Sequence, residues 1–140
     1  MRADDGRLGI ERFRSTLREI ASSRFREAAL QSLAEEARTQ IVLGFRDSKS
    51  PYDEPWAPLE SREGKPLLDT GRLRNSLMPR AVGTSLRIDA NVAYAAAHQY
   101  GTKTIPRRQF LPDQARGLGV RWMRAFRRAL VQVTRDLRGD

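Results

Sequence analysis

Cysteine is absent from the 140 residues of the sequence, which excludes disulfides, thiolate metal sites and a cysteine nucleophile. Histidine occurs once, at His98, with no second histidine and no clustered carboxylates at a ligand spacing, so a zinc site is not expected. No apolar run approaches the ~20 residues that span a bilayer, and no apolar segment near the N-terminus predicts a signal peptide. These absences predict a soluble chain with no metal, no other cofactor and no membrane partner.

Motifs of common enzyme classes are absent as well. There is no Gly-x-Ser-x-Gly elbow, and Gly64-Lys65-Pro66 lacks both the preceding glycine and the following Ser or Thr of a P-loop. Glu63 and Lys65, with Asp53 or Glu60 upstream, resemble the acid-x-lysine pattern of a Mg²⁺-dependent nuclease. Such groups need a rigid strand, whereas these lie in a segment rich in proline and glycine. The nuclease is therefore the weakest hypothesis, and the chain is predicted not to be an enzyme.

The net charge of +9 is densest after residue 112, where residues 113–140 carry seven basic and three acidic side chains, a difference of +4. Arginine, whose planar fork suits carboxylates and phosphates, supplies 23 of the 26 basic residues. This predicts, as an alternative function, a basic nucleic-acid-binding protein. The arginines that would face DNA are Arg121, Arg124, Arg127, Arg128 and Arg135. No aromatic residue interleaves with them on the polar face, which favours a solvated or protein-facing surface, and a GC-rich genome also explains the arginine content.

The length is typical of one domain, and residues 1–140 are predicted to form one. After a flexible stretch over residues 1–6, apolar side chains recur at spacings of three and four over residues 7–46. This spacing predicts amphipathic helices with an interruption at Ser22. The second helix has the clearest pattern in the chain and is expected to end near Arg46.

The character of the sequence changes after these helices. Residues 47–66 are rich in proline, which fixes φ and removes donors, so they predict an extended loop. Loops of about 20 residues in compact domains tend to be functional or disordered. Residues 113–138 return to helical spacing and predict a basic C-terminal helix that begins near Asp113.

Residues 67–112 predict a region of hairpin and sheet. Apolar and polar residues alternate from Leu86 to Val92, which predicts a strand with one buried face. Residues 80–82 can pair with this strand through a type II′ turn that has Gly83 at its first central position. The predicted fold class is α+β: N-terminal helices and a C-terminal helix packed on a small antiparallel sheet, with a long proline-rich loop.

Two short helices are predicted beside the hairpin. Asp69 and Thr70 are expected to cap the first, over residues 71–77, and Pro79 to end it. The second covers residues 94–100 and is expected to close at a glycine. The residues that follow are predicted to be extended, in a loop or at a sheet edge, because they include a proline.

Four short blocks within this central region carry a resemblance. They are Trp56-x-Pro58-Leu59, Pro66-Leu67-Leu68-x-Thr70-Gly71-x-Leu73-x-x-Ser76, Tyr94-Ala95-x-x-His98-Gln99-x-Gly101 and Ile105-Pro106-x-Arg108-x-Phe110-Leu111. In this order and spacing, the blocks resemble the phage virion morphogenesis family. Its members are the tail completion or neck proteins of Mu-like and related tailed phages and prophages. The resemblance covers roughly residues 25–135.

The resemblance implies a non-enzymatic structural protein of the virion, which acts in head–tail joining or tail completion. It implies a subunit of a homo-oligomeric ring, a hexamer or a dodecamer, at the neck or tail end, assembled in the host bacterial cytoplasm. The expected partners are further copies of the chain and neighbouring connector, tail terminator or tail-tube proteins. Arginines that line the lumen of such a ring could also contact genomic DNA without sequence preference.

The residues of the four blocks divide into two predicted roles. The interface with subunits or partners is predicted to comprise Trp56, Leu59, Arg107, Arg108, Phe110 and Leu111. The residues predicted to shape the motif are Leu68, Thr70, Gly71, Leu73, Ser76, Tyr94, His98, Gln99, Gly101 and Pro106. Two residues have a simpler interpretation: Trp56 as an aromatic packed under the loop, and His98 as a structural histidine rather than a catalyst.

Overall fold

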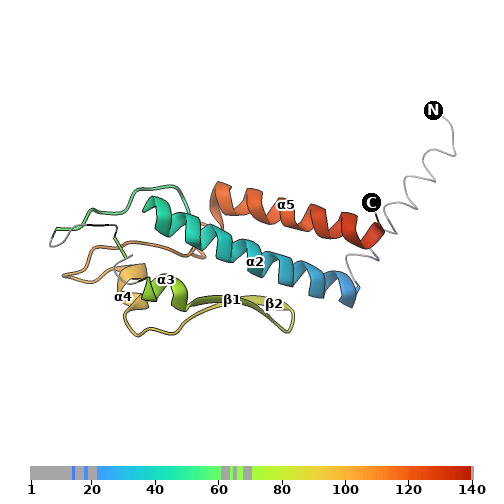
Figure 1. Ribbon diagram of the computed structural model, residues 1–140, viewed down its shortest axis with the longest axis horizontal. Helices are drawn as coiled ribbons and strands as arrows, with labels where there is room; N and C mark the ends of the chain where they lie inside the picture. Colours follow the sequence, from blue (N-terminus) through green and yellow to red (C-terminus); the bar gives the residue numbers. More distant parts are fainter. Residues whose placement is uncertain are drawn as a thin grey trace, which may run out of the picture.

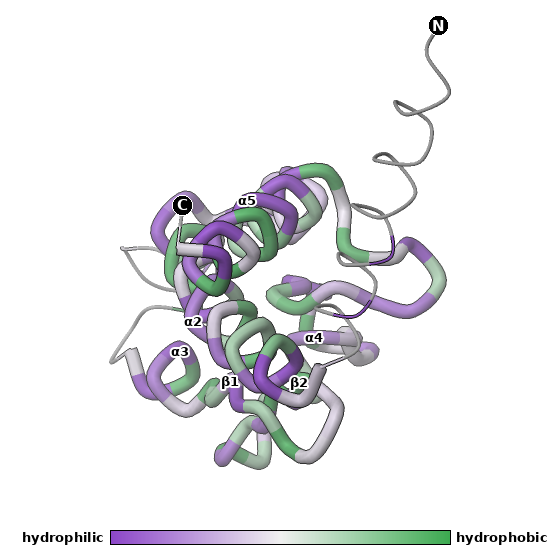
Figure 2. The backbone as a smooth tube through the Cα atoms, turned by 90° about the vertical axis from the view of Figure 1, so that its right-hand side faces the viewer, coloured by the Kyte–Doolittle hydropathy of each residue, from purple (hydrophilic) through white to green (hydrophobic). Residues whose placement is uncertain are grey.

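The computed structural model describes residues 14, 18, 22–60, 64, 66–67 and 71–139. Its centre is the long helix α2 (Ser23–Asp47), with the antiparallel helix α5 (Gly119–Arg138) along one side. The hairpin of β1 (Leu77–Val82) and β2 (Ser85–Ala90) covers the other side of α2. Figures 1 and 2 show α5, α2 and the hairpin as three successive layers. The predicted α+β class is confirmed, although α5 lies on α2 and not directly on the sheet.

Helix α2 begins and ends close to the predicted positions. The hydroxyl of Ser22, where the pattern is interrupted, is the N-cap and accepts a hydrogen bond from the N–H of Phe25 at 3.1 Å. Ser48 ends the helix in the left-handed region with φ 54°. The helix and the flexible stretch predicted before Ser22 lie outside the described residues, apart from Arg14 and Arg18.

The hairpin has the predicted two-residue turn. Val82 pairs with Ser85, and Gly83 has φ 61° while Thr84 does not have a positive φ, as a type II′ turn requires. Leu86 and Ile88 pack on the core as predicted, but Ala90, expected on the same buried face, is exposed because it ends the strand.

Strand β1 is longer than the sequence indicated. Helix α3 (Arg72–Ser76) ends without help from Pro79, and the prediction that this proline terminates it is wrong. Pro79 lies inside β1, opposite Ile88. A two-stranded sheet has only edge strands, where the missing N–H of proline interrupts no central ladder.

Helix α5 begins at Gly119, later than the predicted start near Asp113. The intervening residues form a turn, in which the Asp113 carboxylate accepts from the N–H of Arg116 at 2.7 Å. The Gly117 N–H donates to the Asp113 carbonyl at 2.9 Å. Gly117 and Gly119 both have positive φ, 71° and 79°, so a regular helix cannot start before the second of them.

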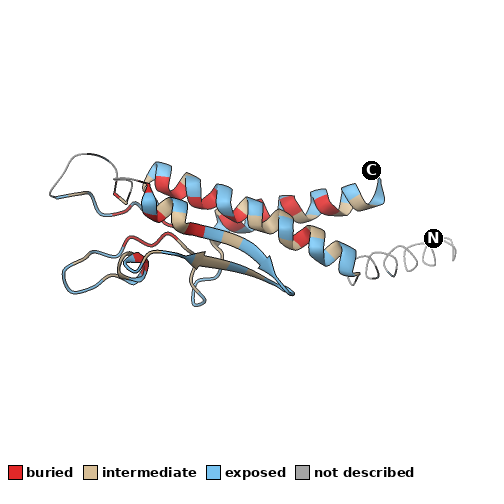
Figure 3. Ribbon diagram, turned by 60° about the horizontal axis from the view of Figure 1, so that its bottom comes forward, coloured by how far each residue is buried: buried red, intermediate tan, exposed pale blue. Residues whose placement is uncertain are grey.

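The core lies on both sides of α2. Phe45 of α2 and Trp122 of α5 are almost completely enclosed, and buried positions recur along both helices (Figure 3). Leu73 and Leu77 bury their side chains in the core on the hairpin side. No described helix is long and apolar enough to cross a membrane.

Candidate functional site

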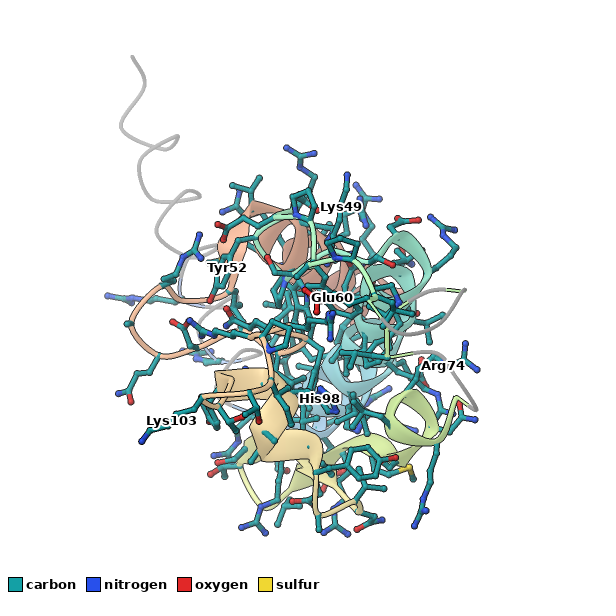
Figure 4. All side chains as sticks on the ribbon, turned by 90° about the vertical axis from the view of Figure 1, so that its left-hand side faces the viewer. Lys49, Tyr52, Glu60, Arg74, His98 and Lys103 are labelled. Atoms are coloured by element: carbon teal, nitrogen blue, oxygen red, sulfur yellow. The ribbon has the colours of Figure 1, made fainter. Side chains whose placement is uncertain are left out.

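Three of the four sequence blocks are described in full or nearly so, and they meet at one end of the molecule, seen in Figure 4. Residues 48–60, helix α4 (Ala95–Tyr100) and residues 101–118 gather there beyond the end of α2. Phe45 anchors this end: its ring packs edge-on against Trp56 at 5.3 Å and at a tilt against Phe110 at 5.7 Å between centroids. Aromatic pairs in these geometries add to the stabilisation from burial alone.

Hydrogen bonds join the two long irregular segments across this aromatic cluster. The indole N–H of Trp56 donates to the Gln109 carbonyl at 2.8 Å. The Arg108 guanidinium donates from Nε to the Ala57 carbonyl at 2.8 Å and from Nη2 to the Pro58 carbonyl at 3.0 Å. Since Arg108 is only 7 % exposed, it acts as an internal clamp that fixes the loop to the segment after α4.

Gln99 holds the same segment from the other side. Its side-chain Oε1 accepts from the backbone N–H groups of Phe110 at 3.0 Å and Leu111 at 3.1 Å, and its Nε2 donates to the Leu111 carbonyl at 2.9 Å. Gln99 therefore fixes the backbone of the segment after α4. The side-chain amide of Gln99 therefore supplies the hydrogen bonds that a neighbouring strand would otherwise give to the backbone of residues 110–111.

Tyr52 provides a third link, which the sequence analysis missed. Its hydroxyl accepts from the Asp113 N–H at 2.9 Å and donates to the Gly117 carbonyl at 2.6 Å. The Arg116 guanidinium lies 3.8 Å from the centroid of the Tyr52 ring and forms an ion pair with Glu54. The signal in the sequence was slight: one tyrosine among prolines, whose partners lie more than 60 residues away.

The structure separates the predicted interface residues into two groups. Trp56, Arg108 and Phe110 are buried in the chain itself, so Trp56 takes the simpler predicted role of an aromatic packed under the loop. Residues 107–111 therefore do not form one continuous contact surface. Of the six, the side chains that reach the surface are those of Leu59, Arg107 and Leu111.

A groove of about 520 Å³ opens at Leu59. Residues 57–60 form one wall, residues 102–106 form the other, and Arg108 closes the bottom. Leu59 lies in the first wall, and Ile105 and Pro106 lie in the second. The groove combines exposed apolar side chains with a carboxylate at Glu60 and an amine at Lys103.

The residues predicted to shape the motif fall at turns and helix ends. Gly71 is the N-cap residue of α3 and has φ 73°. The Ser76 hydroxyl donates to the Leu73 carbonyl at 2.7 Å. Gly101 ends α4 with φ 76°, as predicted for its closing glycine. Tyr94 and Pro106 are largely exposed, whereas Leu68 and the predicted Asp69-Thr70 cap lie outside the described residues.

His98 is half-buried beside Tyr94. Its ring packs edge-on against Tyr94 at 5.9 Å, and its buried Nδ1 has no hydrogen-bond partner among the described atoms. Burial lowers the pKa of the imidazole, and the nearby positive charge of Arg108 lowers it further. Both effects favour the neutral ring at pH 7.

The part of the chain that the structure describes contains no cluster of three histidine, cysteine or carboxylate side chains able to hold a metal ion. Of the residues in the nuclease hypothesis, Asp53 forms an ion pair with Arg121 at 3.5 Å, and Glu60 is exposed. Glu63 and Lys65 lie outside the described residues. The described carboxylates do not converge as a Mg²⁺ site requires.

The arginines of α5 also separate into two groups. Arg121 turns inward, only 22 % exposed, and its guanidinium donates to the carbonyls of Gln40 and Ser50. It therefore belongs to the structural contact between α5 and the end of α2, which removes it from the predicted DNA-facing set. The other four, which point to solvent, are Arg124, Arg127, Arg128 and Arg135.

Comparisons with known proteins agree with the resemblance carried by the four blocks. The sequence model of the phage virion morphogenesis family matches residues 8–135. The Mu-like prophage FluMu G protein 2 of Haemophilus influenzae is 30% identical over 105 residues, which cover 69% of this chain and 74% of that protein. No solved structure matches the chain.

Proposed function

The chain belongs to the phage virion morphogenesis family, and from this premise we propose that it is a structural subunit of an oligomeric ring at the neck or tail end of a tailed-phage particle. It acts there in head–tail joining or tail completion. Its partners are further copies of itself, as a hexamer or dodecamer, and the connector, tail terminator or tail-tube proteins above and below. Assembly takes place in the host bacterial cytoplasm, and the ring then stays in the virion.

The match to the family over residues 8–135 is the observation that supports this function most strongly. The geometry fits a building element, because the family's motif residues serve to fix backbone. Gln99, Arg108 and Trp56 tie two irregular segments to α4 and to each other. Rigid loops at the end of an elongated subunit lose little conformational entropy when they bind, which favours permanent assembly.

The groove between residues 57–60 and 102–106 is the proposed contact for a neighbouring virion protein. Leu59 and Ile105 supply apolar surface, and Glu60 and Lys103 supply charges of both signs. Such a mixture suits a partner segment with a small apolar anchor and a polar rim. Leu59 stays a proposed interface residue because it lines this groove, and Arg107 and Leu111 stay so because their side chains reach the surface.

Removal of the gene from the phage or prophage that encodes the chain tests the proposal. We expect normal amounts of filled heads and of tails, but unjoined or incomplete particles in electron micrographs and a loss of infectivity. Supply of the wild-type chain in trans restores joined particles. Joined, infectious particles in the absence of the chain would contradict the proposed function.

The exposed arginines of α5 favour one second candidate, a nucleic-acid-binding protein. Four arginines on one helix give a local charge that phosphates would attract. This function predicts tight duplex binding by the isolated chain at low salt, with an affinity that falls steeply as salt rises. If the chain does not bind a 30-base-pair duplex at about 50 mM salt, the second candidate is excluded.

A further inference from the structure

Two carboxylates on α2 differ from most others in the described chain. Asp47, Asp53, Glu54, Asp89 and Asp113 each pair with an arginine. Glu27 and Glu35, by contrast, are exposed and make no ion pair with any residue in the described ranges. Eight residues separate them, or about 12 Å along a helix, and both lie at the same groove.

This groove runs between α2 and β1 and has a volume of about 460 Å³. Its walls include the apolar side chains of Leu30, Ala34, Pro79 and Ala81. Two cations also reach it, Arg38 and Arg80, and Arg80 is held by Asp89 at 2.8 Å. The lining therefore holds two carboxylates and two guanidiniums, and because Arg80 is already paired with Asp89, only Arg38 remains to oppose Glu27 and Glu35.

The outer face of α5 is positively charged. Arg124, Arg127, Arg128 and Arg135 are exposed, and none makes an ion pair with a described residue. Apolar side chains lie among them: Val131 is 46 % exposed and Met123 is 45 % exposed. This arginine face, from Arg124 to Arg135, extends about 16 Å along the helix, which is close to the length of the groove's acidic rim.

The two surfaces lie on opposite sides of the molecule. In Figure 1, α5 covers one side of α2, and the hairpin that forms the groove covers the other. A surface and its complement on opposite sides of one chain cannot meet within that chain. They can meet between copies, and contacts of this head-to-tail kind produce a closed ring when the rotation between copies closes.

We propose that the arginine face of α5 in one copy docks into the α2/β1 groove of the next copy. Glu27 and Glu35 pair with arginines of the neighbour, while Val131 packs toward Leu30 and Ala34. The inference rests on the proposed ring function and names the two surfaces that build it. The exposed valine and methionine favour a protein partner over DNA, because a phosphate backbone offers them nothing to bury against.

Charge reversal in the full-length chain tests this docking. One variant carries Glu27→Lys and Glu35→Lys, and the other carries Arg124→Glu and Arg128→Glu. Each alone places like charges across the contact, so sedimentation should show self-association weakened roughly 100-fold or more. An equimolar mixture restores opposite charges at every contact, and we expect it to assemble like the wild type. Circular dichroism and urea unfolding confirm that both variants fold.

A control with the same loss of positive charge carries Lys49→Glu and Arg87→Glu, at exposed positions in the segment after α2 and on β2. It should assemble like the wild type. The docking is overturned if both reversal variants assemble normally or if their mixture stays dissociated. It is also overturned if Arg124→Glu and Arg128→Glu abolish duplex DNA binding but leave assembly intact, since the face would then be a DNA surface.

The outcomes separate this inference from the proposed function. Normal rings from both reversal variants refute the docking surfaces and leave the ring proposal standing. A wild-type chain that is monomeric at every concentration in solution refutes the docking, even if particles contain the protein. Joined, infectious particles without the chain refute the proposed function itself.

Discussion

At the residue scale, a few polar side chains stabilise the end of the molecule where the sequence blocks meet. They do so through hydrogen bonds to backbone groups. Gln99 and Arg108 together satisfy five backbone groups in segments that have no sheet or helix partner. The sequence placed Gln99 among the residues that shape the motif, because it lies in one of the four blocks. It could not predict the burial of Arg108, because the carbonyls that receive its guanidinium lie about 50 residues away in the chain.

Replacement of Gln99 by leucine should destabilise the fold strongly. The change leaves the buried N–H groups of Phe110 and Leu111 without acceptors, at a cost of roughly 2–4 kcal/mol in the free energy of unfolding. Urea denaturation measures the difference. Gln114→Leu, at an exposed position, is the matched control and should change the stability by less than about 0.5 kcal/mol. Equal stabilities for the two variants would refute the role given to Gln99.

His98 should make stability depend on pH in the window below about 7, near the ordinary pKa of an imidazole. Burial lowers the pKa of the folded imidazole below its ordinary value of 6.5, so the unfolded chain binds the proton more readily in this window. The contribution is therefore complete above pH 6.5 and is lost as the pH falls through the folded pKa. Asp47 and Asp113, whose pKa values are lowered by hydrogen bonds, lose their contributions only below about pH 4.

The pH effect of His98 can be isolated because the chain has no other histidine. Urea denaturation at pH 7.5 and pH 5.5 should show a smaller loss of unfolding free energy in His98→Gln than in the wild type. The same loss in both proteins would show that the imidazole does not titrate differently in the folded state.

At the element scale, the periodic helices could be predicted and the irregular segments could not. The stripe that ends at Phe45 identified α2 to within a few residues, because a buried helical face imposes its period on the sequence. The start of α5 was predicted too early, since the pattern does not reveal that Gly117 and Gly119 have positive φ. The first strand was likewise predicted too short. It includes Pro79, which an edge strand tolerates because no central ladder needs its missing N–H.

The two glycines before α5 provide a matched pair of substitutions. In Gly119→Ala the new Cβ would lie 2.9 Å from the Pro51 carbonyl oxygen and 2.9 Å from Cδ1 of Tyr52, in addition to the cost of φ +79°. In Gly117→Ala the φ is similar, +71°, but the Cβ meets nothing within 4 Å. We expect a loss of roughly 2–4 kcal/mol for the first and about 1–2 kcal/mol for the second. Thermal unfolding of both variants would contradict the described packing if their order were reversed.

At the scale of the whole molecule, the family could be identified from the sequence because four blocks occur in one order and spacing. Each block alone is short, and three of them meet only when α4 and the two long segments fold onto Phe45. The distribution of unpaired charges over the surface could not be predicted, because it depends on which carboxylates form ion pairs with arginines in the folded chain. Glu27 and Glu35 make no ion pair with a described residue, which depends on where the fold places α2 and β1.

Cryo-electron microscopy of purified particles, with mass spectrometry of their proteins, tests the structural role most directly. We predict that the chain is present in every particle, with density for a ring of its copies at the neck or tail end. Particles that lack the chain, together with a purified protein that stays monomeric beside its connector and tail partners, would contradict it.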